Sequence, residues 1–111
     1  MNRNRFKAAI ALLAMAGGLF CLPAQAGKTL EGIRLRGQVA CGVHTGLAGF
    51  SAPDASGRWT GLDVDICRAI AAAVLGDAAR VTYVPLTAQQ RFTALQSGEV
   101  DVLSRNTTFT L

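Results

Sequence analysis

The chain offers few side chains for catalysis or metal binding. His44 is its one histidine, and Cys41 and Cys67 lie 26 residues apart. A hydrolytic triad needs a nucleophile, a base and an orienting carboxylate, and a zinc site needs about four ligands at short spacing. The sequence shows neither pattern, and it has no Gly-rich phosphate loop. We therefore expect no enzyme activity, no metal site and no cofactor.

Asp63 and Asp65 are the carboxylates closest to an acid–base pair, being two residues apart. They stand where an apolar helical pattern begins, and aspartate at that position caps exposed backbone N–H groups and favours the positive end of the helix dipole. We therefore predict that one of them caps the helix.

Polar groups follow the three segments that read as buried strands. They form the stretches 44–47, 86–88 and 105–108, and the last is rich in hydroxyl and amide groups. In a doubly wound sheet, ligands bind outside the carboxyl ends of the strands. These stretches suit a small polar ligand carrying a carboxylate and an ammonium, although ordinary polar loops would have the same composition.

Strands and helices alternate along the chain. The apolar and β-branched runs 38–43, 81–84 and 100–103 predict strands, the second stopped by Pro85. The pieces 50–52 and 58–60 flank a turn and predict a hairpin. Helical spacing predicts a helix that ends at Gly76. The order is that of an α/β protein with a βαβαβ parallel sheet and a hairpin inserted after the first strand.

Two further details concern the second helix and the start of the fold. The helix opens with Thr87 and Gln90 at capping-box spacing, and Phe92 and Leu95 are predicted to form its buried stripe. Residues 27–37 are predicted to form a loose leader or a short helix.

The first 26 residues have the features of a cleavable secretory signal peptide. Arg3, Arg5 and Lys7 precede an uncharged apolar run of residues 8–22, and small residues at 24 and 26 suit a signal peptidase. Residues 27–111 carry eight basic and seven acidic side chains, and the basic ones are scattered. We therefore expect a periplasmic protein that does not bind nucleic acid.

Export would place Cys41 and Cys67 in an oxidising compartment. One lies on the first strand and the other in the first turn of the helix expected to pack over it. The sequence leaves two alternatives open, a disulfide or two buried thiols.

Four stretches together resemble the periplasmic solute-binding proteins of family 3, the polar amino-acid class. They are residues 61–66 (GLDVDI), 41–50 (CGVHTGLAGF), 91–101 (RFTALQSGEVD) and 104–111 (SRNTTFTL). In their order along the chain, they are similar to the general L-amino-acid-binding proteins of ABC importers. The resemblance runs from about residue 27 to residue 111.

The resemblance implies a two-lobed protein that closes on an L-amino acid and then docks on the membrane permease of an ABC importer. Leu47 and Phe50 would wall the pocket, Asn106 would contribute backbone contacts, and Thr108 would bind through its hydroxyl and N–H. The remaining candidates are a polar side chain at His44 and the weaker Thr45 and Thr107.

The resemblance also implies that residues 27–111 form an incomplete first lobe of a solute-binding domain. Relatives hold the ligand carboxylate with an arginine a few residues beyond the last motif, and Arg105 is not its equivalent. Without that contact, about 2–3 kcal/mol of binding free energy is lost, so we expect little or no amino-acid affinity from this chain alone. Two alternatives stay open: an exported dehydratase of the cyclohexadienyl type on the same scaffold, and a fragment of a sensor domain.

Overall fold

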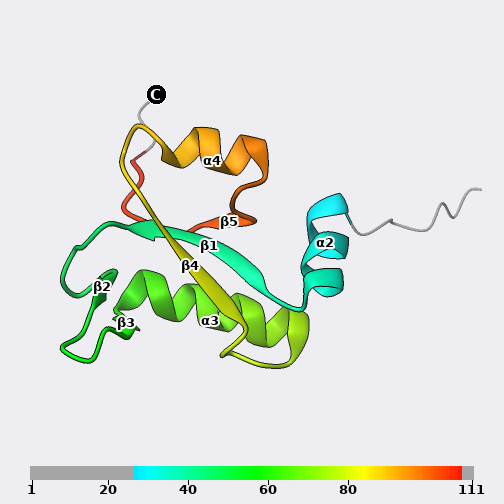
Figure 1. The fold of residues 1–111 in the computed structure, drawn as a ribbon, viewed down its shortest axis with the longest axis horizontal. Helices are drawn as coiled ribbons and strands as arrows, with labels where there is room; N and C mark the ends of the chain where they lie inside the picture. The colour runs from blue at the N-terminus through cyan, green and yellow to red at the C-terminus, as the bar shows by residue number, and fades with distance from the viewer. Residues whose placement is uncertain (1–26, 109–111) are drawn as a thin grey trace, which may run out of the picture.

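The computed structural model describes residues 27–108 (Figure 1). The predicted signal peptide and residues 109–111 lie outside this range. In chain order the elements are α2 (Lys28–Arg36), β1 (Val39–His44), β2 (Ala52–Pro53), β3 (Trp59–Thr60), α3 (Leu62–Leu75), β4 (Val81–Leu86), α4 (Arg91–Ser97) and β5 (Val102–Leu103).

β1 is the central strand of a three-stranded parallel sheet with the order β4-β1-β5. It pairs with β4 over its whole length, from Val39 opposite Val81 to His44 opposite Leu86. Its pairing with β5 is shorter and begins with Cys41 opposite Val102. The predicted α/β class and the parallel βαβαβ order are confirmed. β2 and β3 pair as the expected antiparallel hairpin.

Helices cover both faces of this sheet: α3 lies on one face and α4 on the other (Figure 1). On the α3 side, Cys41 and Val43 of β1 pack with Cys67 and are fully buried. On the α4 side, Leu86, Ala94 and Val100 form a separate buried cluster. A strand buried on both faces must be apolar at nearly every position, as residues 39–43 are.

α3 ends where the sequence predicted, at Gly76, whose φ of 73° is left-handed. The prediction that Asp63 or Asp65 caps its start is wrong. The N-cap residue is Gly61, and no side chain caps the helix. Both carboxylates lie inside the first turn, where they still favour the helix dipole, and Asp63 is turned inward and buried.

The structure corrects the predicted end of β4 at Pro85 and confirms the predicted capping box before α4. β4 continues through Pro85 to Leu86, which an edge strand tolerates because a proline without an N–H can face away from the sheet. Thr87 and Gln90 make the reciprocal bonds of a capping box, at 3.2 and 3.3 Å from backbone nitrogen to side-chain oxygen. The regular helix starts later than this box, at Arg91.

The buried stripe predicted for α4 is wrong. Phe92 and Leu95 are 51% and 39% exposed, whereas Ala94 between them is 3% exposed. The small side chain of Ala94 faces the sheet and packs with Leu86 and Val100. A seven-residue helix presents only one narrow face to the core, and here that face centres on the alanine.

α2 is the short helix that the sequence offered as one of two alternatives. Its last residue, Arg36, forms an ion pair with Asp101, whose carboxylate also accepts the backbone N–H of Ala40 at 2.9 Å. These contacts fix α2 to the beginning of β1 and to the segment before β5. Within residues 27–108, no helix has the length and apolar character needed to cross a membrane.

Candidate functional site

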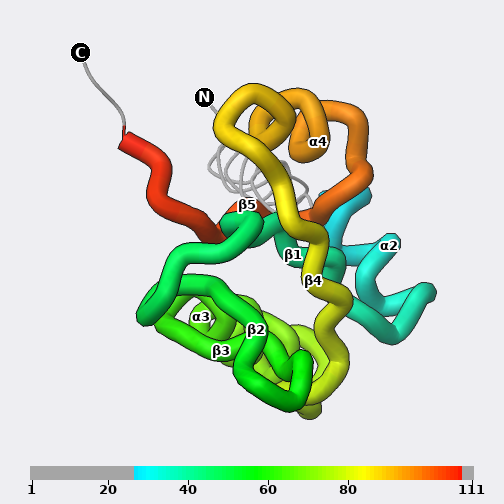
Figure 2. The backbone as a smooth tube through the Cα atoms, turned by 60° about the vertical axis from the view of Figure 1, so that its left-hand side comes forward, coloured from blue at the N-terminus to red at the C-terminus, as the bar shows by residue number. Residues whose placement is uncertain are grey.

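The three parallel strands end at one edge of the sheet, which we call the carboxyl rim. It comprises residues 44–51 after β1, 87–90 after β4 and 104–108 after β5. Figure 2 looks toward this rim, with the loop after β1 in green, the turn before α4 in yellow and the last described segment in red. The predicted ligand residues His44, Thr45, Leu47, Phe50, Asn106, Thr107 and Thr108 all lie on the first and third of these stretches.

The stretch after β1 folds back on itself in a tight turn. Leu47 donates its N–H to the carbonyl of Ser51 at 2.8 Å and accepts the Ser51 N–H at 2.9 Å. His44 is half-buried, and its Nδ1 accepts the N–H of Gly46 at 3.0 Å. Phe50 is 43% exposed. A partly exposed phenylalanine at the tip of the turn can contact a ligand, which a core side chain cannot.

A buried polar cluster, formed by Ser51, Asp63 and Ser104, holds the rim together. The Ser51 hydroxyl donates to a carboxylate oxygen of Asp63 at 3.4 Å and accepts the N–H of His44 at 2.9 Å. The Ser104 hydroxyl donates to the Asp63 carbonyl at 3.0 Å. All three residues are less than 8% exposed. Asp63 therefore links the loop after β1 to the loop after β5.

Gly61 allows the start of α3 to approach this turn closely. Its φ is 119°, and a Cβ atom there would lie 2.3 Å from the carbonyl oxygen of Phe50. The Asp63 N–H donates to that same carbonyl at 2.9 Å. Only glycine fits, because a side chain would push the turn away from the helix. In the GLDVD motif, the glycine thus permits the close approach, and the backbone N–H of the first aspartate holds the turn by its hydrogen bond to Phe50.

The stretch after β5 is held by two arginines. Arg105 donates to the carbonyl of Leu86, at the end of β4, and to Oδ1 of Asn106 at 3.2 Å. Arg91, the first residue of α4, donates to the carbonyl of Asn106 at 3.1 Å. Asn106, Thr107 and Thr108 are exposed. The arginines thus connect the ends of β4, β5 and α4.

Arg105 is the residue of the rim whose electrostatic surroundings are most clearly perturbed. Burial lowers the pKa of the Arg105 guanidinium, the positive charge of Arg91 lowers it further, and the charge of Asp63 opposes the shift. An arginine remains protonated under all ordinary conditions. The shift therefore marks a cation in a partly desolvated and positively charged setting.

The structure brings His44, Leu47 and Phe50 together in one turn, and it places Asn106 between the two arginines. The two groups are joined through the Asp63 cluster. Sequence reasoning missed Asp63 as a connector, because an aspartate at a helix start is usually a cap. It also missed Ser51 and the two arginines, for which the sequence carries no recognisable signal.

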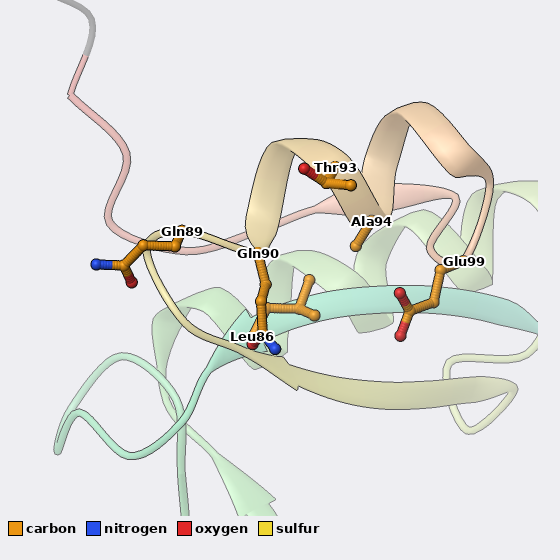
Figure 3. A pocket seen from close by; sticks show the side chains of 6 residues that line it. All are labelled: Leu86, Gln89, Gln90, Thr93, Ala94 and Glu99. Atoms are coloured by element: carbon orange, nitrogen blue, oxygen red, sulfur yellow. The ribbon is translucent and has the colours of Figure 1, made fainter.

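A cavity of about 250 Å³ lies beside the rim, between α4 and the end of β4 (Figure 3). It is lined by Leu86, Gln89, Gln90, Thr93, Ala94 and Glu99. None of the predicted ligand residues contributes to it. The cavity therefore shares Gln89 and Gln90 with the rim but lies apart from the two stretches that carry the predicted ligand residues.

Cys41 and Cys67 are joined by a disulfide, with Cα atoms 6.1 Å apart. Both residues are fully buried between β1 and α3. The bridge fixes the helix that carries Asp63 onto the central strand. Within residues 27–108, no three His, Cys, Asp or Glu side chains are grouped to hold a metal ion.

Residues 39–111 match the bacterial extracellular solute-binding proteins, family 3. The whole chain is 53% identical to the general L-amino acid-binding periplasmic protein AapJ of Rhizobium johnstonii, of which it covers 32%. It therefore spans about a third of the length of that relative.

Solved structures agree with this match. An ABC transporter periplasmic binding protein from Brucella ovis, solved with glutathione bound, is 55% identical with a TM-score of 0.73. The alignment covers 77% of this chain and 26% of that one. Domain 1 of TmArgBP, solved in an arginine-bound form as a mutant, is 26% identical with a TM-score of 0.64, over 73% of this chain and 60% of that one. The chain belongs to the bacterial extracellular solute-binding proteins, family 3.

Proposed function

We propose that this chain is part of the amino-acid-binding component of an ABC importer and that its carboxyl rim forms one side of the ligand site. The observation that carries the proposal is the convergence of the loops after β1 and β5 on one buried residue, Asp63. Loops fixed in this way present their exposed groups in a constant arrangement, which reduces the entropy lost when a ligand binds.

The exposed groups suit a small zwitterion with an organic side chain. Leu47 and Phe50 offer apolar surface, and the polar candidates offer hydroxyl, amide and imidazole groups. A mostly apolar wall with a few placed polar groups is typical of small-molecule sites. In this proposal His44, Thr45, Leu47, Phe50, Asn106, Thr107 and Thr108 contact the ligand.

The similarity to a protein named for periplasmic L-amino-acid binding supports the same ligand class, a periplasmic location and a role without catalysis. The similarity to the Brucella ovis protein, an ABC transporter periplasmic binding protein, supports a membrane permease as the partner. Residues 1–26 are proposed as the cleaved signal peptide, and residues 27–111 as the first lobe or part of it.

Titration of the purified chain with single L-amino acids, followed by NMR, tests this proposal. In residues 27–108 the rim would contact a ligand from one side only, so we expect weak binding, with a Kd of about 1 mM. The Thr108→Val variant removes one hydroxyl contact and should weaken binding about 3- to 10-fold. Thr93→Val, a matched change at a cavity residue outside the rim, should leave the affinity unchanged.

Failure of every L-amino acid to bind at tens of millimolar would refute the proposal, because a Kd above that concentration corresponds to less than about 3 kcal/mol of binding free energy. Equal weakening by the two threonine variants would remove the rim from the site. The dehydratase alternative predicts instead that prephenate or arogenate is consumed.

A further inference from the structure

The cavity between α4 and the end of β4 has an apolar floor. Leu86 and Ala94 are 4% and 3% exposed, and they pack with Val100 in one buried cluster. The volume of about 250 Å³ is below the range of about 300–1,000 Å³ that is typical of sites for drug-sized ligands. The cavity therefore suits a ligand of only a few heavy atoms, part of which is aliphatic.

The wall of the cavity at the rim end is fixed by the capping box. The side-chain oxygen of Gln90 accepts the Thr87 N–H at 3.2 Å and the Thr87 hydroxyl at 3.0 Å. Both lone pairs of this oxygen are then engaged, so Gln90 offers an incoming ligand only its amide N–H groups. A cation therefore finds no acceptor on this wall.

The wall at the opposite end of α4 carries Glu99, one residue beyond the C-cap of the helix. The next residue, Val100, donates its N–H to the Ala94 carbonyl at 3.3 Å, so the turn that bears Glu99 folds back against the helix. Figure 3 shows the Glu99 carboxylate on the same side of α4 as the side chains of Leu86 and Gln90. The fold of this turn thus places a carboxylate at the cavity.

Glu99 gives its end of the cavity a negative charge. Among the six described residues that line the cavity, Glu99 alone is charged. Within residues 27–108, no basic side chain lies within 4 Å of its carboxylate. Arg105 reaches the carbonyl of Leu86, but this bond lies where β4 ends, at the rim. The carboxylate of Glu99 therefore remains available to a cation from outside the described chain.

We propose that the cavity binds a short aliphatic primary amine, with the ammonium group at Glu99 and the carbon chain on Leu86 and Ala94. A hydrogen bond between an ammonium and a carboxylate is stronger than one between neutral groups, and the carbon chain loses contact with water on the apolar floor. An anion would be repelled by Glu99, and a neutral ligand would leave its charge uncompensated.

This site is distinct from the proposed amino-acid site and does not depend on it. In a free L-amino acid the carboxylate is attached to the same carbon as the ammonium, so it would come close to Glu99 and be repelled. A simple amine has no such group. The two surfaces therefore select different ligands.

NMR titration of the purified chain with n-butylammonium and with 1-butanol tests the proposal, because the two probes share a four-carbon chain and differ in charge. n-Butylammonium should bind about tenfold more tightly, with the largest amide shifts at Thr93, Ala94 and Glu99. Glu99→Gln should bring the affinities of the two probes within about twofold of each other. Glu31→Gln removes the same charge from an exposed position on α2 and should change neither affinity.

The comparison of the two probes on the unmodified chain does not depend on the folding of any variant. Equal affinities there, or shifts centred outside the residues that line the cavity, would overturn the proposal. Equal weakening of n-butylammonium binding by Glu99→Gln and Glu31→Gln would also overturn it, because the cation would then be attracted to any exposed carboxylate. Each of these results would leave the proposed function intact, since residues 44–51 and 104–108 take no part in the cavity.

Discussion

Replacement of Gly61 by alanine tests whether the close approach between the turn after β1 and the start of α3 builds the rim. A Cβ atom at Gly61 would lie 2.3 Å from the carbonyl oxygen, 2.5 Å from the carbonyl carbon and 2.8 Å from the nitrogen of Phe50. All three are backbone atoms, which cannot move aside as the end of a flexible side chain can. The φ of 119° is also unfavourable for any residue with a Cβ.

The expected loss has two parts. A non-glycine residue in a sparsely populated backbone region costs about 1–3 kcal/mol, and overpacking against fixed atoms costs about 1–3 kcal/mol more. We therefore expect Gly61→Ala to lower the free energy of unfolding by about 3 kcal/mol. Native proteins have only about 5–15 kcal/mol in total, so the variant should lose about a fifth to three fifths of its stability.

Gly57→Ala is the matched control. Gly57 has a φ of 80°, and a Cβ atom there would have no neighbour within 4 Å. It carries the backbone cost without the clash, so we expect a loss of about 1 kcal/mol.

Urea unfolding followed by tryptophan fluorescence measures both variants. The chain has one tryptophan, Trp59, which lies on β3 with its ring centroid 6.1 Å from that of Tyr83. The wild-type midpoint should exceed that of Gly57→Ala, which in turn should exceed that of Gly61→Ala. Equal midpoints for the two variants would refute the close approach and the role assigned to the GLDVD motif.

Three further predictions concern the scaffold. Replacing Cys41 and Cys67 by serine should lower the free energy of unfolding by about 3 kcal/mol, and a reductant should then have no further effect on the urea midpoint. Hydrogen bonds from the Ser56 hydroxyl and the Arg58 N–H lower the pKa of Asp54 from 3.8 to about 2. Its contribution to stability is therefore complete above pH 3.8 and lost as the pH falls through about 2, so urea midpoints of wild type and Asp54→Asn should converge in acid. Asp101→Ala removes a carboxylate that accepts two hydrogen bonds, so it should lower the free energy of unfolding, measured by thermal unfolding, by about 2 kcal/mol. A loss below about 0.5 kcal/mol would contradict this role of Asp101.

The order of elements could be predicted from the sequence because each strand carries its own local pattern. Residues 39–43 are apolar at nearly every position, as a strand covered on both faces must be, and Gly76 ends α3 as expected. The parallel sheet then follows from the alternation of strands and helices.

Long-range contacts could not be predicted in the same way. Asp63 looks like a helix cap by its neighbours in sequence, but the position of Ser51 draws its side chain inward. Phe92 has helical spacing from Leu95, but which face of α4 meets the sheet depends on the fit of Ala94 between Leu86 and Val100. Local spacing does not contain either piece of information.

The arginine pair of the rim depends on tertiary structure even more strongly. Arg91 and Arg105 are separated by fourteen positions and converge only because α4 and β5 return to the same edge of the sheet. The predicted contacts Asn106, Thr107 and Thr108 came from resemblance, and the structure adds that this stretch is held by two cations.

Mapping of an amino-acid ligand onto the chain by NMR is the most direct test of the central claim. On addition of L-glutamate, the largest amide shifts should fall on residues 44–51 and 104–108, at the carboxyl ends of β1 and β5. Shifts centred instead on the cavity between α4 and β4, at Thr93, Ala94 and Glu99, would contradict the assignment of residues 44–51 and 104–108 as the ligand surface.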